Sequence, residues 1–320
     1  MYDAELAVAL QAVRQACRVC NRVQSSFDLG ALTKTDRSPV TVADFAAQAV
    51  IAKALGDAFP DDALVAEERS DALREAAQQE LLQRAAALSD MAPETLLASI
   101  DRGSGQAAER FWTLDPVDGT KGFLRSEHYA VALALIERGR VVLGVLGCPR
   151  LPLQGAGITA AGDGVGSVMS VVAGERPMLW DETGTSATPV RTSSERDLQR
   201  MRACESVESG HSKHDVAASV AQELGIQSAV RVDGQVKYAL VARGDADVYW
   251  RLPTRADYRE KIWDHAAGAA IVEAAGGKVT DIDGRPLDFG RGTTLSANRG
   301  IIASNGLAHD AIVAAVARRF

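Results

Sequence analysis

The chain has 320 residues, of which 47% are apolar and 24% charged, and its net charge at pH 7 is −7. This composition is typical of a globular protein with a large core, and the length allows two domains. The acidic balance argues against a nucleic-acid-binding protein, and no apolar run approaches the ~20 residues of a membrane span. An acidic protein can still bind an anionic small molecule where metal ions reverse the charge locally.

Helices are predicted to dominate the first hundred residues. The N-terminal apolar residues recur at helical spacing, which is typical of an amphipathic helix and not of a signal or transit peptide. A run rich in Ala, Gln, Leu and Glu is predicted to form a peripheral helical excursion. The predicted elements are helices at 4–23 and 42–57, a strand at 64–66, helical residues at 70–89 and a loop at 101–105.

The most informative stretch is Phe111-Trp112-Thr113-Leu114-Asp115-Pro116-Val117-Asp118-Gly119-Thr120. An apolar strand is predicted to stop at Pro116, which has a fixed φ and no N–H. Two carboxylates this close repel each other unless a cation lies between them, and Mg²⁺ prefers such oxygen ligands. Gly119 permits a tight turn, and Thr120 offers a hydroxyl beside backbone amides that can face an anion. The alternative is a plain Asp/Gly turn after a strand.

The rest of the chain changes character near residue 180. Before it, two apolar runs at 128–136 and 140–147 are predicted to form a hairpin, followed by a Gly-rich, β-favouring stretch. Residues 181–186 are interpreted as the crossover between two domains, an α+β domain at 1–183 and an α/β domain at 184–320. The elements predicted in the second domain are strands at 202–207, 229–232, 246–251 and 278–281 and helices at 213–224, 235–243 and 264–275.

Three further acidic residues have both a structural and a chemical interpretation. Glu67 follows a strand, and is either a solvated helix start or a third carboxylate of a two-metal cluster. Asp264 opens a helix rich in small residues, and is an N-cap, a ligand of an ion at the helix start, or both. Thr41-Val42-Ala43-Asp44 resembles a capping box with Asp in place of Glu, and its spacing alone favours this structural explanation.

Basic residues and cysteines leave similar alternatives. Lys237 on its own is interpreted as a solvated helix residue. Arg251 stands among apolar strand residues, which indicates a buried anionic partner because an unpaired buried charge is costly. Cys17-x-x-Cys20 is compatible with a metal or redox site, but it lies in a helical pattern without a second Cys/His pair, so buried thiols are favoured.

Taken together, the motifs resemble the ordered signature of the metal-dependent, lithium-sensitive phosphatases, the superfamily of inositol monophosphatase and fructose-1,6-bisphosphatase. The resemblance covers nearly the whole chain and implies a layered α-β-α-β-α sugar-phosphatase fold of α+β and α/β parts. The motifs that carry it are Ser38-Pro39-Val40-Thr41-Val42-Ala43-Asp44, Ala66-Glu67-Glu68, residues 115–120 and Trp263-Asp264-His265-Ala266-Ala267-Gly268.

Within that superfamily the chain is most similar to the 3′(2′),5′-bisphosphate nucleotidases. Plain inositol monophosphatases usually lack the Tyr258-Arg259-Glu260-Lys261 run and the Gln235-x-Lys237-Tyr238 run. The other stretches that carry this likeness are residues 111–115, 121–125, 210–214, 232–238, 247–253 and 258–264.

The resemblance implies roles for the matching residues. Glu67, Asp115 and the carbonyl of Val117 would hold one Mg²⁺, and Asp115, Asp118 and Asp264 a second, with a third, weaker ion near Glu67. Asp44 and Thr120 would orient and deprotonate the attacking water. The implied substrate-binding set is Gly119, Thr120, His211, Gly234, Lys237, Arg251 and Asp264. Gly234 departs from the family, which usually has Ser there, so a side-chain hydrogen bond to the nucleotide would be lost.

The function implied is that of a cytoplasmic, lithium-sensitive phosphatase linked to sulfate assimilation. It would remove the 3′-phosphate of 3′-phosphoadenosine 5′-phosphate, and of the sulfated form, by direct attack of a metal-activated water, giving AMP from the former. The expected partner is this small nucleotide bisphosphate, without nucleic acid or membrane, and the expected state is a monomer or homodimer. The alternatives are a related phosphatase acting on inositol mono- or bisphosphate or a sugar phosphate, and a regulatory protein that binds nucleotide without turnover.

Overall fold

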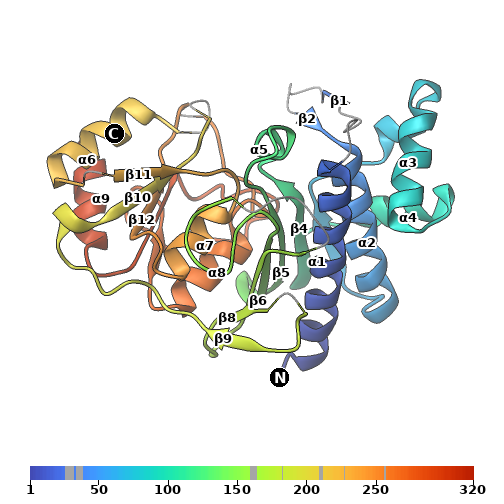
Figure 1. Ribbon diagram of the computed structural model, residues 1–320, viewed down its shortest axis with the longest axis horizontal. Coiled ribbons are helices and arrows are strands. Elements are labelled where there is room, and N and C mark those ends of the chain that lie inside the picture. The colour runs from blue at the N-terminus through green and yellow to red at the C-terminus, as the bar shows by residue number, and fades with distance from the viewer. Residues whose placement is uncertain are drawn as a thin grey trace.

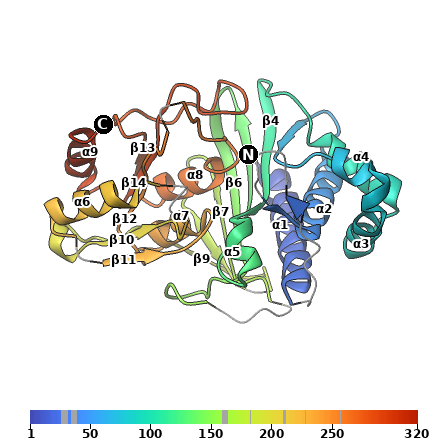
Figure 2. The same cartoon turned by 90° about the horizontal axis from the view of Figure 1, so that it is seen from above.

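The computed structural model describes residues 1–25, 32–33, 39–158, 164–181, 183–208, 212–226, 228–255 and 257–320. Its described part contains a seven-stranded sheet, a five-stranded sheet and a short pair, β1 (Leu32–Thr33) with β2 (Pro39–Val40). The two larger sheets are separated by α7 (Val236–Ala242) and α8 (Ala266–Ala274), and further helices cover their outer faces (Figures 1 and 2). The predicted α-β-α-β-α layering is confirmed.

The large sheet has the order β3-β4-β5-β6-β7-β8-β9. Its strands are β3 (Ala63–Ala66), β4 (Arg110–Asp118), β5 (Ala130–Glu137), β6 (Arg140–Cys148), β7 (Ser167–Val172), β8 (Met178–Trp180) and β9 (Ala187–Pro189). β3 and β4 pair in parallel, and the remaining neighbours are antiparallel. The predicted hairpin is present, and its turn residues Arg138 and Gly139 both have positive φ, the conformation that a tight two-residue turn requires.

The predicted helices at 4–23 and 42–57 are present as α1 (Asp3–Gln24) and α2 (Val42–Ala58), and both pack on one face of this sheet. α2 is buried on nearly all sides because α1, β4, α3 (Gln79–Ser89) and α4 (Pro93–Arg102) surround it. The predicted helical excursion at 70–89 is an α-helix only in its second half, α3. Residues 71–74 and 76–78 form 3₁₀ turns. α4 was not predicted. Among the described residues, no helix combines the length and apolar character needed to cross a bilayer.

The small sheet has the order β11-β10-β12-β14-β13. Parallel pairing joins β10 to β11 and to β12, while β14 runs antiparallel to both of its neighbours. Its strands are β10 (Arg202–Glu205), β11 (Ser228–Arg231), β12 (Val248–Arg251), β13 (Lys278–Thr280) and β14 (Ile301–Ser304), and α6 (His214–Leu224) and α9 (His309–Ala317) lie on its outer face (Figure 2). The predicted elements are all present, whereas β14 and α9 were not predicted.

Small residues let α8 lie close to the large sheet and to α7. A Cβ on Gly268 would be 2.4 Å from the ring of Tyr238, and one on Gly144 would be 3.2 Å from the carbonyl oxygen of Ala267. Alanine and glycine on this helix therefore serve close packing between the two sheets.

The connection between the sheets differs from the predicted crossover. The N–H of Asp181 donates to the carbonyl of Ser186 at 2.9 Å, and β8 and β9 form a hairpin around this turn within the large sheet. The chain reaches the small sheet only at Arg202. The division into domains 1–183 and 184–320 stays a prediction.

The four cysteines are buried and none forms a disulfide. Burial raises the pKa of Cys17 and of Cys204 to about 12, and raises that of Cys20 as well. These thiols therefore behave as small apolar core residues, as the helical pattern around Cys17 and Cys20 predicted.

Candidate active site

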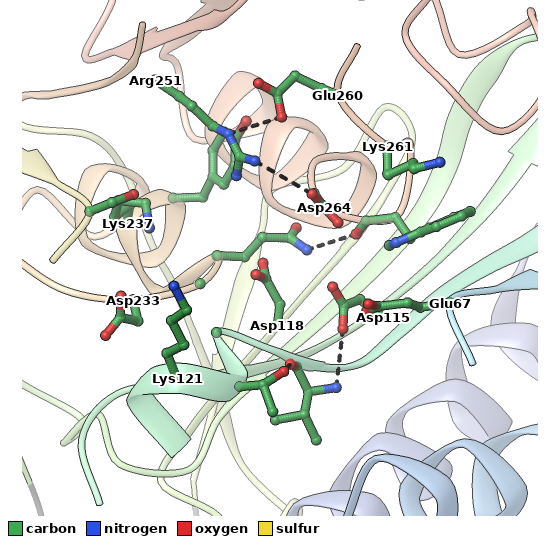
Figure 3. A pocket seen from close by; sticks show the side chains of 18 of the residues that line it. Glu67, Asp115, Asp118, Lys121, Asp233, Lys237, Arg251, Glu260, Lys261 and Asp264 are labelled. Carbon is green, nitrogen blue, oxygen red and sulfur yellow. Dashed lines mark hydrogen bonds and ion pairs between the residues drawn. The ribbon is translucent and has the colours of Figure 1, made fainter. Parts of the chain in front are cut away.

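The acidic motif lies where β4 ends, but the strand does not stop at Pro116. β4 continues to Asp118 through a bulge in which Pro116 and Val117 both lie opposite Val131, between the pairs of Asp115 and Asp118 with β5. A bulge leaves backbone groups unpaired, so a residue without an N–H is tolerated there. In a regular strand, residues three apart point to opposite faces of the sheet. The bulge instead brings Asp115 and Asp118 to the same pocket (Figure 3).

The turn after β4 is fixed by two local hydrogen bonds and by a glycine. The N–H of Val117 donates to Asp115 Oδ1 at 3.1 Å, and the hydroxyl of Thr120 donates to the Val117 carbonyl at 3.1 Å. Gly119 has φ +95°, and a Cβ there would also lie 2.9 Å from the backbone nitrogen of Gly234. The predicted tight turn is confirmed, and the glycine lets segments from the two halves of the chain touch at this point.

A cavity of about 600 Å³ opens beside this turn. Its lining combines the carboxylate end of the large sheet with basic residues from β12 and α7 (Figure 3). Of the predicted site residues it contains Glu67, Asp115, Val117, Asp118, Gly119, Thr120, Gly234, Lys237, Arg251 and Asp264. His211 lies outside the described residues. One pocket therefore brings together residues from both halves of the chain, which lie up to nearly 200 positions apart in the sequence.

Asp44 does not line this cavity but is buried at the start of α2. The backbone N–H and the hydroxyl of Thr41 donate to Asp44 Oδ2 at 2.8 and 2.7 Å, and the N–H of Ala43 donates to the hydroxyl of Thr41 at 3.1 Å. The predicted capping box is confirmed. The charge of Asp44 contributes to the raised pKa of Asp115, so the two carboxyl groups are close enough to interact.

Asp264 is not an N-cap. α8 begins at Ala266, its capping position is His265, and no side chain caps it. The Asp264 carboxylate is instead directed into the pocket, facing Asp118 and Asp115 (Figure 3). The interpretation of Asp264 as a helix cap is therefore wrong, and its interpretation as a ligand of an ion in the pocket stays a prediction.

The pocket carboxylates repel one another. Burial raises the pKa of Asp115 well above its usual range, and the charges of Glu67 and Asp118 add to the shift. Burial also raises the pKa of Asp118 to about 6, although Lys237 and Arg251 pull it down. The pKa of Asp264 is raised in the same way by burial and by its acidic neighbours, against the effect of Arg251.

Such a cluster is suited to divalent cations. Carboxylate oxygens and a peptide carbonyl are the ligands Mg²⁺ prefers, and a cation would remove the cost of holding several buried negative charges together. Glu67, Asp115, Asp118, Asp264 and the carbonyl of Val117 offer this donor set. The residues present therefore fit a magnesium site.

Opposite the carboxylates stand two cations, a buried lysine on α7 and a half-buried arginine on β12. Lys237 is 3% exposed, and its ammonium donates to the carbonyl of Val232 at 3.2 Å. Burial lowers the pKa of Lys237, while Asp118 and Asp233 offset part of that effect. The guanidinium of Arg251 contacts Glu260 Oε2 at 2.9 Å and lies 3.8 Å from Asp264 Oδ2. The pocket thus has a negative and a positive wall, as a phosphate ester bound beside metal ions requires.

Sequence reasoning missed a buried network behind Arg251. Tyr238 and His265 Nδ1 share a hydrogen bond of 2.8 Å, and His265 Nε2 lies 3.3 Å from Glu260 Oε2. The carboxylates of Glu260 and Asp264 and the ring of His265 lie within 4.8 Å of one another, a spacing that also suits an ion, but Glu260 is already paired with Arg251 at 2.9 Å. The motifs 235–238, 258–264 and 263–268 contain Tyr238, Glu260, Asp264 and His265, so the available signal for these residues was the motifs themselves.

Comparison with known proteins agrees with this arrangement. The family model described as "Inositol monophosphatase family" matches residues 2–319. A protein of Schizosaccharomyces pombe named "3'(2'),5'-bisphosphate nucleotidase" is 42% identical over 95% of this chain and 92% of its own length. Proteins of the same name from Emericella nidulans and Oryza sativa are each 41% identical, with 98% and 95% of this chain covered and 98% and 91% of their own lengths.

Solved structures share the fold at lower identity. The extragenic suppressor protein suhB of Bartonella henselae superposes with a TM-score of 0.70 at 22% identity, covering 99% of this chain and all of its own. An IMPase of Thermotoga maritima gives a TM-score of 0.69 at 21% identity, covering 99% of this chain and 98% of its own. The predicted resemblance is confirmed, and the chain belongs to the inositol monophosphatase family.

Proposed function

We propose that this chain is a Mg²⁺-dependent 3′(2′),5′-bisphosphate nucleotidase, which hydrolyses the 3′-phosphate of 3′-phosphoadenosine 5′-phosphate to give AMP and phosphate. The observation that carries the proposal is the pocket with a carboxylate wall facing Lys237 and Arg251. Full-length relatives that bear the nucleotidase name support this substrate over others of the family. The inositol monophosphatase family is metal-dependent, which agrees with the donor set of the pocket.

The metal centre would hold two ions, with a third, weaker ion near Glu67. Glu67, Asp115 and the Val117 carbonyl would hold one ion, and Asp115, Asp118 and Asp264 the second. Bound there, the ions supply activation of the attacking water and neutralisation of charge on the phosphoryl group.

The chain's own residues prepare the water. Because the Thr120 hydroxyl donates its hydrogen bond to the Val117 carbonyl, its lone pairs remain available to accept a hydrogen bond from water. Asp44, held by Thr41 outside the cavity and close enough to influence Asp115, would act with Thr120 as the pair that orients and deprotonates the water. The backbone amides of Gly119 and Thr120 would contact the phosphoryl oxygens. Neither a serine nor a histidine is assigned as nucleophile, so the proposal contains no phosphoenzyme.

The positive wall would hold the rest of the nucleotide. Arg251 can grip a phosphate with two donors, and Lys237 would act as a point charge. Asp264, Gly234 and His211 complete the proposed contacts, with His211 on the sugar or base. Gly234 has no side chain and would contribute backbone contacts only, and a Cβ there would lie 2.2 Å from the carbonyl oxygen of Asp118.

The test is phosphate release with Mg²⁺ from four substrates at equal concentration: 3′-phosphoadenosine 5′-phosphate, AMP, myo-inositol 1-phosphate and fructose 1,6-bisphosphate. The proposal expects strong preference for the first and accumulation of AMP. Preference for an inositol or sugar phosphate would replace the substrate and keep the chemistry. Nucleotide binding without phosphate release would instead support the regulatory protein.

Further parts of the proposal are activity on the sulfated nucleotide, a link to sulfate assimilation, a cytoplasmic location, inhibition by Li⁺ and a monomeric or homodimeric state. Sulfated substrate and a Li⁺ titration can be added to the same assay. Sedimentation equilibrium measures the state of association, and a species larger than a dimer would contradict it.

A further inference from the structure

The aromatic side chains that line the pocket differ in what remains exposed. The lining includes Tyr238, Tyr249, Tyr258 and Trp263. Tyr238 and Tyr249 are 1% exposed and Trp263 is 8% exposed, whereas Tyr258 is 38% exposed. Of these four rings, only Tyr258 therefore offers a substantial free surface to a ligand.

The other three rings are already engaged. Tyr238 and Tyr249 pack edge to face with their centroids 5.0 Å apart, and the Tyr238 hydroxyl is bonded to His265. The ammonium of Lys261 lies 5.4 Å from the centroid of the Trp263 ring and covers part of it. Trp250, next to Arg251 in β12, is 1% exposed and belongs to the core between the small sheet and its outer helices.

Tyr258 also has a fixed relation to the positive wall. Its hydroxyl lies 3.5 Å from Arg251 Nη2, so the phenol edge adjoins the guanidinium that is proposed to grip phosphate. A tyrosine ring presents an apolar face together with a polar hydroxyl, a combination that suits a binding site in which the face meets a ligand and the hydroxyl meets polar neighbours. A nucleotide bound to Arg251 through phosphate carries its flat base within reach of such a ring.

We propose that Tyr258 is a base-recognition residue, on whose ring the nucleobase of the substrate stacks. The inference rests on the proposed nucleotidase function and deepens it, because stacking would distinguish a nucleotide from a polyol phosphate. Base–aromatic stacking stabilises binding through the π-face that every nucleobase has and that inositol and sugars lack. Tyr258 then selects for an aromatic base, while the metal site acts on phosphate esters in general.

The experiment compares two substrates that differ only in the base: 3′-phosphoadenosine 5′-phosphate and the abasic 1-deoxyribose 3,5-bisphosphate. The measured quantity is the ratio of their kcat/KM values in the wild type and in Tyr258→Ala, Tyr258→Leu and Tyr258→Phe. We expect the ratio to fall by roughly 10- to 100-fold in the Ala and Leu variants, mainly through KM, and to be kept in the Phe variant. Tyr258→Phe is the matched control because it removes only the hydroxyl that faces Arg251.

Equal losses on both substrates would overturn the inference, because they would mean that Tyr258 acts only through Arg251 or through pocket shape. An unchanged ratio in the Ala and Leu variants would overturn it as well. AMP binding, measured by calorimetry in the same variants, keeps the test independent of turnover. If the wild type fails to hydrolyse the nucleotide, the proposed function falls, whereas the stacking inference then depends on whether Tyr258→Ala weakens AMP binding.

Discussion

Replacing Asp118 with Asn is expected to stabilise the metal-free protein and to abolish its Mg²⁺-dependent activity. Burial and the charge of Glu67 raise the pKa of Asp118 from 3.8 to about 6, in spite of Lys237 and Arg251. The folded state therefore disfavours the ionised carboxylate that it must carry at neutral pH. Asparagine has nearly the same shape and no charge, so it removes this cost together with a proposed metal ligand.

The magnitude follows from the two pKa values. At pH 7.5 the carboxylate is ionised in both states, and the shift from 3.8 to about 6 costs the folded protein about 3 kcal/mol. Since the folded pKa is the higher one, the cost is absent below the unfolded pKa, grows as the pH rises from the unfolded to the folded pKa, and is complete above the folded one. At pH 4.5 only about 1 kcal/mol remains. The advantage of Asp118→Asn should correspond to a melting temperature roughly 3–6 °C higher at pH 7.5.

The assay is thermal or urea unfolding in EDTA at pH 7.5 and 4.5, repeated with saturating Mg²⁺. Wild-type protein should gain about 2.7 kcal/mol at a Mg²⁺ concentration one hundred times its Kd, and the variant much less. Asp310→Asn is the matched control, because Asp310 is exposed and paired with Lys278 at 2.8 Å, so its loss should not stabilise. An Asp118→Asn protein that is less stable than wild type in EDTA at pH 7.5 would refute the reasoning, as would near-normal turnover.

Three other substitutions test neighbouring parts of the site. Lys237→Met keeps the buried alkyl chain but removes the charge, so KM for the nucleotide bisphosphate should rise roughly tenfold more than KM for myo-inositol 1-phosphate; equal effects would contradict a nucleotide-specific contact. Gly234→Ala places a Cβ 2.2 Å from the Asp118 carbonyl at φ +61°, whereas Gly174→Ala at φ +85° meets nothing within 4 Å. Gly234→Ala should therefore lower the melting temperature much more than Gly174→Ala, which costs only the ~1–2 kcal/mol of placing a side chain on a left-handed backbone. Equal melting temperatures would show that the loop at Gly234 moves to accommodate the Cβ. Thr41→Val should cost ~1–2 kcal/mol in urea unfolding and reduce kcat, while Thr41→Ser restores both; failure of serine to rescue would mean that the hydroxyl is not what matters.

The sequence predicted best those elements whose ends are marked by local turn and capping residues. The hairpin between β5 and β6 follows from its turn residues, and the capping box at Thr41 marks the start of α2 within one residue. α4 was missed because its apolar positions, Leu96 and Ile100, are too few to establish a helical period. β14 was missed because it is buried throughout and therefore shows no alternation of apolar and polar residues.

Predictions failed where tertiary context overrode a local rule. A proline ends most strands, but β4 has a bulge at Pro116, where the missing N–H is tolerated. Asp264 has the position of a helix cap, yet the helix starts two residues later and the carboxylate faces the pocket. The partners of Glu260 come from β12 and from the start of α8, so no spacing along the chain could reveal that Glu260 positions Arg251.

The burial of all four cysteines has a practical consequence. With a pKa of about 12, fewer than about one in 10⁴ of the Cys17 or Cys204 thiols is a reactive thiolate at pH 7.5, and the surrounding core excludes reagents as well. Alkylating dyes should therefore leave the native protein unlabelled. A single cysteine introduced on the pocket rim could then carry a fluorophore that reports nucleotide binding, with every native thiol left in place.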